Sequence, residues 1–178
     1  AEGVVLDSLS KKGGWARKKR AAKRRAEEVV QHLLNLYIKR RGLSRPAFSQ
    51  DPSLEKPFLA SFPFEDTPDQ VGAWNNISDD LSANSPMDRL LCGDVGFGKT
   101  ELAIRAAFRV VVGGKRVVVL SPTTILANQL YSSFSARLEP GAISVDMVSR
   151  FRSQKDLGVV KNNIIENNND VLVGTHAV

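Results

Sequence analysis

Apolar residues in the first quarter of the chain recur at the spacing of an α-helix. Four of them follow one another at intervals of four, three and four positions and therefore share one helix face: Ala26, Val30, Leu33 and Tyr37. Neither proline nor glycine interrupts residues 15–41, and Gly42 follows at a position where glycine commonly ends a helix. The pattern predicts one helix over residues 15–41, with a length of roughly 40 Å.

The periodic pattern stops between Gly42 and Pro57. This stretch also contains Pro46, Pro52 and several serines, and proline disfavours both helix interiors and central strands. We therefore expect a linker without regular structure here, and a domain boundary near Pro57.

Helix-like and strand-like segments alternate after the expected linker. Thr67 can cap a helix, Pro68 suits its first turn, and Gln70 completes a capping box. Further helices are expected over residues 101–112, after the caps Thr123 and Thr124, and around Leu157, Val160 and Ile164. Short strands are expected over residues 90–92, 116–120, 143–148 and 170–173. This alternation predicts an α/β fold in which helices cover both faces of a parallel sheet.

The composition excludes several classes of protein. The chain has 178 residues, of which 42% are hydrophobic and 25% charged, as in globular domains, and no apolar run approaches the roughly 18 residues of a membrane span. Cys92 is the only cysteine, which excludes an intramolecular disulfide and a multi-cysteine zinc site. We expect Cys92 to be a buried strand residue without chemistry, and His32 to lie on the surface of the long helix.

Charge is distributed unevenly along the chain. Residues 1–45 hold 13 Lys and Arg against 4 Asp and Glu, a net charge of +9, whereas the remainder carries −3. Much of the excess lies in residues 11–25, which have no apolar stripe. Three interpretations of that stretch stay open: a solvated helix end or flexible arm, a contact with nucleic acid or an acidic protein, and a nuclear localisation signal.

A glycine-rich loop lies between the strand expected at residues 90–92 and the helix expected at residues 101–112. Its residues match the pattern G-x-x-x-x-G-K-[ST]: Gly93, Asp94, Val95, Gly96, Phe97, Gly98, Lys99 and Thr100. The glycines let backbone N–H groups point at phosphate oxygens, and the following helix adds its positive end. Lys99 would contact the β- and γ-phosphates and Thr100 would bind Mg²⁺, which makes these two the candidate catalytic residues. The alternative is a glycine-rich turn with a solvated lysine, and the loop alone does not distinguish ATPases from GTPases and kinases.

Five motifs in order, together with an N-terminal segment, carry a resemblance to a known family. They lie at residues 62–70, 87–101, 121–127, 148–152 and 173–177, and residues 6–9 followed by the basic helix extend the likeness. Together they resemble the family of bacterial transcription-repair coupling factors (Mfd). That family, with the related RecG translocases, belongs to the superfamily 2 helicase-like ATPases, and the resemblance covers almost the whole chain.

The resemblance implies a domain organisation. Residues 1–14 would be the tail of a polymerase-interacting region, and residues 15–57 the long basic helix with its Pro- and Ser-containing linker. Residues 58–178 would be the N-terminal part of a first RecA-like ATP-binding lobe, which is a P-loop parallel sheet with helices on both faces. The implied cofactors are ATP and Mg²⁺.

The resemblance also implies roles for residues outside the loop. Gln70 would recognise adenine, Phe62 or Phe64 would line the base site, and Glu101 would complete the nucleotide-contacting motif. DNA phosphates would be held beyond the carboxyl ends of the strands by seven residues: Pro122, Thr123, Thr124, Ser149, Arg150, Thr175 and His176. Simpler roles stay open, namely helix capping for Gln70 and the two threonines, and packing for the two phenylalanines and the histidine.

The whole protein implied by the resemblance is an ATP-dependent double-stranded DNA translocase that couples transcription to repair by displacing stalled RNA polymerase. Its partners would be double-stranded DNA, RNA polymerase and nucleotide-excision repair proteins, with no membrane. The 178 residues contain no strand with the acidic pair that holds Mg²⁺ and activates water, so we expect this piece to bind ATP and DNA phosphates but not to hydrolyse ATP by itself. The alternatives are a RecG-type branch-migration helicase and a short, catalytically dead nucleotide- or DNA-binding protein. We expect a cytoplasmic location, with a plastid as the alternative.

Overall fold

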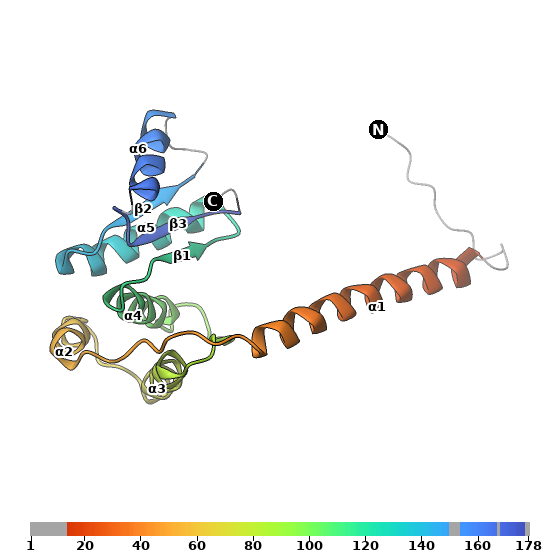
Figure 1. The fold of residues 1–178 in the computed structure, drawn as a ribbon, viewed down its shortest axis with the longest axis horizontal. Helices are drawn as coiled ribbons and strands as arrows, with labels where there is room; N and C mark the ends of the chain where they lie inside the picture. Colours follow the sequence, from red (N-terminus) through yellow and green to blue (C-terminus); the bar gives the residue numbers. More distant parts are fainter. Residues whose placement is uncertain (1–13, 150–153, 167, 177–178) are drawn as a thin grey trace. The chain divides into compact units, whose positions relative to one another are not determined.

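The computed structural model describes residues 14–149, 154–166 and 168–176 of the chain. The chain divides into two compact units, Ala1–Ser44 and Arg45–Val178. Figure 1 labels the α-helices and the strands. The elements follow one another as α1 (Gly14–Arg41), α2 (Pro52–Ala60), α3 (Pro68–Ser82), α4 (Lys99–Val112), β1 (Val117–Leu120), α5 (Thr124–Leu138), the 3₁₀ helix η1 (Glu139–Gly141), β2 (Val145–Val148), α6 (Gln154–Ile165) and β3 (Val171–Gly174).

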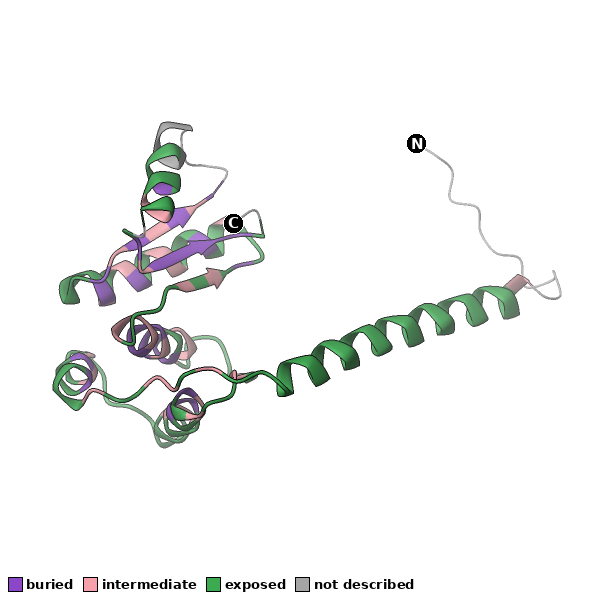
Figure 2. Ribbon diagram, in the orientation of Figure 1, coloured by how far each residue is buried: buried purple, intermediate pink, exposed green. Residues whose placement is uncertain are grey.

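Helix α1 confirms the helix predicted from residues 15–41. It ends at Arg41, where the backbone N–H of Gly42 donates to the carbonyl oxygen of Ile38 at 3.2 Å. None of its residues is buried (Figure 2), so the apolar face is open to solvent along its length, and His32 lies on the helix surface as expected. No helix in the described part of the chain is both long and apolar enough to cross a membrane.

The prediction that residues 42–57 lack regular structure is confirmed for residues 42–51 but is wrong for residues 52–57, because helix α2 covers Pro52–Ala60 in the second unit. Asp51 caps this helix, since its carboxylate accepts hydrogen bonds from the backbone N–H and the hydroxyl of Ser53 at 3.0 and 2.5 Å. Pro52 stands in the first turn, where no backbone N–H is needed. An N-cap residue followed by proline is the same signal that begins α3, and here it outweighs the density of prolines.

Three parallel strands form the sheet of the second unit, in the order β1-β3-β2. The register aligns Val171 of the central strand with Val117 on one side and Val145 on the other. All four residues of β3 are buried, as expected of a strand with neighbours on both edges. The sheet confirms the parallel α/β fold that the alternating pattern predicts.

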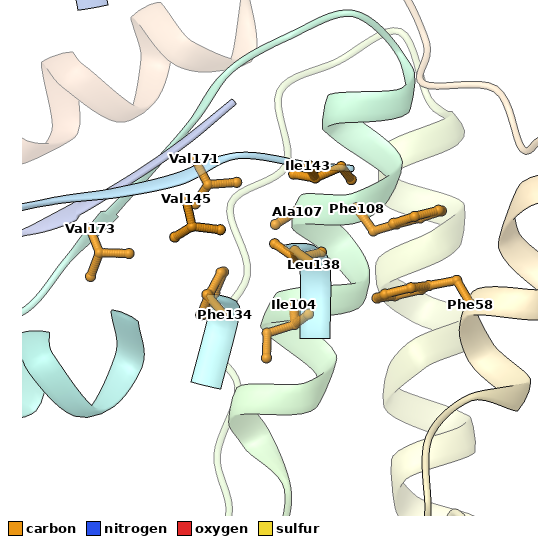
Figure 3. Close-up of a cluster of buried hydrophobic side chains, with 10 residues drawn as sticks. All are labelled: Phe58, Ile104, Ala107, Phe108, Phe134, Leu138, Ile143, Val145, Val171 and Val173. Carbon is orange, nitrogen blue, oxygen red and sulfur yellow. The ribbon is translucent and has the colours of Figure 1, made fainter. Parts of the chain in front are cut away.

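Helices α4 and α5 cover one face of the sheet. Val171 and Val173 of β3 pack there in one core cluster with Ile104 of α4 and with Phe134 and Leu138 of α5 (Figure 3). This cluster fixes the position of α4, and therefore of the glycine-rich loop from which α4 begins.

Helix α6 covers the opposite face, but only in part. The Asn163 amide of α6 donates to the carboxylate of Asp146 on β2 at 3.2 Å. On β1, by contrast, the same face is open to solvent, with Val118 and Leu120 58% and 65% exposed. Both faces therefore carry helices as predicted, while coverage of the second face stops short of β1.

Residues 90–92 do not form the predicted buried strand. Leu90 is 86% exposed and Cys92 is exposed too, which also corrects the expectation that Cys92 is buried. A strand is stable only where its backbone groups find partners. Among the described residues, the three sheet strands pair with one another and leave this segment without a ladder. Leu91 instead lines an apolar cavity of about 450 Å³ beside β1 and α4.

Candidate nucleotide-binding site

The glycine-rich loop at residues 93–100 ends in the first turn of α4. Gly96 and Gly98 have φ angles of 85° and 72°, in a region that residues with side chains rarely adopt. Gly98 is also the N-cap of α4, and a Cβ atom built there would lie 2.4 Å from Nε2 of Gln70. The backbone conformation therefore favours glycine at both positions of the motif, and at Gly98 a side chain would also displace the end of the Gln70 side chain.

The ammonium group of Lys99 is held against the loop backbone. Its Nζ donates to the carbonyl oxygens of Gly93 and Asp94, at 2.6 and 2.5 Å. A positive charge thus lies next to the N-terminal end of α4, where the helix dipole already favours anions. Thr100 follows Lys99 in the first turn of this helix. The described residues include no group of three or more His, Cys, Asp or Glu arranged to hold a metal ion.

Gln70 connects the start of α3 with the loop. Its Oε1 accepts from the backbone N–H of Thr67 at 2.8 Å, and its own N–H donates to Oγ1 of Thr67 at 3.3 Å, so the predicted capping box is confirmed. The Nε2 of the same side chain donates to the carbonyl oxygen of Phe97 at 3.1 Å. Gln70 therefore caps one helix and contacts the loop that precedes another, while its contact with adenine stays a prediction.

A network of ion pairs joins the segment before α3 to α4 and α5. Arg105 donates through both Nη atoms to the two carboxylate oxygens of Asp66, at 2.7 and 3.0 Å, and through Nε to Glu101 at 3.0 Å. Arg137 donates to both oxygens of Glu101, at 3.0 and 2.7 Å. Burial lowers the pKa of Arg105, yet the hydrogen bonds to Asp66 and Glu101 outweigh burial and raise it, so the guanidinium stays charged. The carboxylate of Glu101, a predicted nucleotide contact, is engaged in this network.

Both arginines of that network lie close to the ring of Phe62. The guanidinium carbons of Arg105 and Arg137 lie 5.1 and 5.7 Å from the centroid of its ring. Phe64 packs edge-on against Phe62, with the centroids 5.4 Å apart, and is itself 72% exposed. Of the two predicted base-site aromatics, Phe62 is thus held by cation–π contacts, whereas most of the Phe64 side chain faces solvent.

A second ion pair lies one turn further along α4. Arg109 donates through Nε and Nη2 to the two carboxylate oxygens of Glu55 in α2, at 2.5 and 3.0 Å. Its Nη1 donates to the carbonyl oxygen and the hydroxyl of Ser78 in α3, at 3.1 and 2.8 Å. The side chains of Arg109 and Glu55 are 1% and 10% exposed. This pair fastens α2 and α3 to α4 without contacting the loop or Gln70.

The described residues among those predicted to hold DNA phosphates follow the carboxyl ends of the three strands. The three strands end in register, with Leu120 and Val148 both aligned to Gly174, so their carboxyl ends are brought together as expected. Pro122 and His176, which follow two of these ends, are exposed, whereas Ser149 and Thr175 are buried.

The two threonines after β1 lie at the start of helix α5. The Thr123 hydroxyl accepts from the backbone N–H of Leu126 at 3.2 Å and caps α5, so its simpler role is confirmed. Thr124 is the first residue of that helix. Arg150 lies outside the described residues.

Sequence analysis missed the three arginines that organise this region. Glu101 and Arg105 stand four residues apart on a helix, which is the spacing of an ion pair, and Arg109 follows after another four. Charged residues among apolar positions of a helix signal buried partners. Asp66 and Glu55, however, are 39 and 54 residues away from their arginines, and no local pattern connects them.

The fold and the loop together define a class of protein, the P-loop α/β proteins. A family model described as DEAD/DEAH box helicase matches residues 67–178. This match covers more than half of the chain and includes the loop, the capping box and all three strands. The chain belongs to the DEAD/DEAH box helicase family.

Comparison with curated proteins points to one group of relatives. The chain is 41% identical over 175 residues to the transcription-repair-coupling factor of Borreliella burgdorferi, covering 98% of this chain and 16% of the relative. It is 40% identical over 170 residues to the same factor of Staphylococcus aureus, covering 94% of this chain and 15% of the relative. The chain is a homologue of transcription-repair-coupling factors and spans about one sixth of their length.

A solved structure shares the fold. The structure of RecG bound to a three-way DNA junction superposes with a TM-score of 0.74 at 29% sequence identity, over 81% of this chain and 20% of that one. The second unit therefore has the fold of a RecG-like helicase lobe.

Proposed function

We propose that the second unit binds ATP at the loop of residues 93–100. The observation that carries this proposal is the conformation of the loop. Two glycines with positive φ precede the N-terminus of α4, and the ammonium of Lys99 is held beside them by two carbonyl oxygens. Phosphate oxygens would accept hydrogen bonds from the loop N–H groups and from Lys99, and Thr100 would give its hydroxyl to a phosphate-bound Mg²⁺.

The preference for adenine in this proposal rests on Gln70. Its amide lies at the loop, bonded to the carbonyl oxygen of Phe97. An amide offers both a donor and an acceptor, which matches the adjacent donor and acceptor of adenine. The membership of the chain in a helicase family agrees with ATP as the nucleotide.

The proposal includes DNA binding through phosphates at the carboxyl ends of the strands. Pro122, Thr123 and His176 are exposed there, and a hydroxyl and an imidazole at this surface suit phosphate contacts that do not depend on base sequence. For the whole protein we propose an ATP-dependent translocase on double-stranded DNA that acts on stalled RNA polymerase and works with repair proteins. Identities of 40–41% to coupling factors favour this over a RecG-type helicase, for which the structural match is 29% identical. That the 178 residues do not hydrolyse ATP by themselves stays a prediction.

Replacing Lys99 tests the nucleotide site. We expect Lys99→Ala to weaken binding of a labelled ATP by about 10- to 150-fold, since charge-assisted hydrogen bonds contribute about 1.5–3 kcal/mol. Binding is measured by titration with and without Mg²⁺, and circular dichroism checks that the helix content is unchanged. Lys115→Ala removes an exposed lysine of the same unit and serves as the control. Equal affinity of wild type and Lys99→Ala would show that the loop is an ordinary turn.

A further inference from the structure

The segment that leads into α3 is attached to the nucleotide loop and its helix at two points. At one end, Asp66 forms its two hydrogen bonds with Arg105. At the other end, four residues later, Gln70 donates to the carbonyl oxygen of Phe97. Between them, the hydroxyl and N–H of Thr67 are both bonded to Gln70. The position of the Gln70 amide therefore depends on both attachments.

Arg105 supports two of the three side chains that are candidates for contacting the base, Gln70 and Phe62. It holds the start of α3, and with it Gln70, through Asp66. It also lies 5.1 Å from the centroid of Phe62. The Arg105 side chain is 2% exposed, and a two-pronged guanidinium–carboxylate pair fixes direction as well as distance.

We propose that Asp66 and Arg105 are positioning residues for base selection: their ion pair sets the place of Gln70 beside the loop and thereby the preference for adenine over guanine. This inference rests on the proposed nucleotide site and deepens it. The phosphate-binding part of the site is supported separately, by the loop glycines and by the bonds of Lys99 to Gly93 and Asp94. Loss of the ion pair should therefore change base preference much more than affinity for phosphate.

The chain offers a matched control in Glu55 and Arg109. This pair is also two-pronged, although Arg109 uses Nε and Nη2 where Arg105 uses its two Nη atoms, and Arg109 follows four residues later on the same helix. The two arginines are buried alike, whereas the carboxylate of Glu55 is 10% exposed and that of Asp66 28%. It fastens α2 and α3 to α4 but makes no contact with Gln70, Phe62 or the loop among its described hydrogen bonds. A purely structural role of the Asp66–Arg105 pair predicts that the two pairs behave alike, whereas a positioning role predicts that they differ.

The test uses the whole 178-residue chain and measures the dissociation constants of ADP, GDP and inorganic tripolyphosphate. Wild type should prefer ADP over GDP. Asp66→Asn keeps the shape of the side chain but removes its charge, and should reduce the ADP-to-GDP preference about tenfold, while tripolyphosphate affinity changes less than twofold. Arg105→Lys keeps the charge but cannot form two parallel bonds, and should reduce the preference as well. Glu55→Gln should leave the preference at the wild-type value.

The results distinguish a positioning role of the Asp66–Arg105 pair from a purely structural one. The proposal is overturned if Asp66→Asn and Arg105→Lys, folded by circular dichroism, keep the wild-type preference, or if Glu55→Gln loses it to the same degree. If Asp66→Asn does not fold, Arg105→Lys with its Glu55→Gln control gives the answer. A wild type that binds ADP and GDP equally, with Gln70→Ala indistinguishable from it, overturns the proposed adenine site and the inference together.

Discussion

Arg109 illustrates how much of the second unit depends on single side chains. Its guanidinium is 1% exposed, joins Glu55 of α2 to Ser78 of α3, and lies 5.0 Å from the ring centroid of Trp74. A buried charge of this kind is tolerated because nearly every donor has a partner. Removal of the arginine would leave the Glu55 carboxylate buried without its counter-charge.

We expect Arg109→Met to lower the free energy of unfolding by about 3–5 kcal/mol, the range measured when one partner of a buried ion pair is removed. Denaturation by urea, followed by circular dichroism, measures the change. The double variant Arg109→Met/Glu55→Leu should recover part of the loss, because no unpaired carboxylate then remains. Recovery is incomplete since the two hydrogen bonds to Ser78 are also lost. An Arg109→Met variant as stable as wild type would contradict this account.

At the residue scale, sequence analysis could find what a local pattern encodes. The eight-residue motif located the loop, and the structure bears out its need for glycine at Gly96 and Gly98. Two patterns single out Gln70, the capping box and the family resemblance, and its side chain does contact the loop. The pairing of Arg105 with Asp66 is set by the tertiary fold over 39 residues, and a single sequence contains no signal for it.

At the scale of elements, capping residues predict where two of the helices begin. Thr67 and Thr123 both accept from a backbone N–H three residues later, and α3 and α5 begin directly after them. Helix α2 carries an equivalent signal in Asp51, which the surrounding prolines obscured. The strand expected at residues 90–92 failed for a different reason: apolar residues favour a strand, but only a neighbouring strand can complete it.

The cap of α2 leads to a pH-dependent prediction. Hydrogen bonds from the Ser53 side chain and backbone lower the pKa of Asp51 below its ordinary value of 3.8. A carboxylate with a lowered pKa stabilises the fold fully above its unfolded-state value, and this stabilisation is lost as the pH falls through the folded-state value. Asp51→Asn keeps a good N-cap but cannot titrate, so its unfolding free energy should vary less than that of wild type below about pH 4. Thermal denaturation between pH 2.5 and 7 measures both proteins, and identical pH profiles would exclude this role.

At the scale of the whole molecule, the two units differ in charge. The basic residues of α1 are exposed and lie mainly in its first half, while most of its apolar residues lie in the second half. The exposed ion pairs from Lys23 to Glu27 and from Arg24 to Glu28, at 3.8 and 4.0 Å, neutralise only part of that charge. A dense run of exposed positive charge attracts polyanions such as the phosphate backbone of DNA.

This charge predicts that DNA binding by the chain weakens steeply with salt. The logarithm of affinity should fall with the logarithm of salt concentration by about 0.9 for each phosphate contact. Lys19→Ala/Arg25→Ala should reduce the slope by up to about 2 if both residues contact phosphates. Lys39→Ala/Arg41→Ala removes the same charge from the other end of α1 and should leave more of the slope intact. Fluorescence anisotropy with duplex DNA at several salt concentrations measures it, and a flat wild-type curve would mean that this half of α1 is merely solvated.

The uncovered side of β1 has a practical consequence for anyone who purifies the chain. Val118 and Leu120 are exposed beside an apolar cavity of about 450 Å³, and no described strand pairs with the outer edge of β1. An open edge of this kind is a template onto which a strand of another molecule can add. The chain should therefore self-associate at high concentration, which is seen as turbidity of the solution. The substitution Val118→Lys should reduce this turbidity.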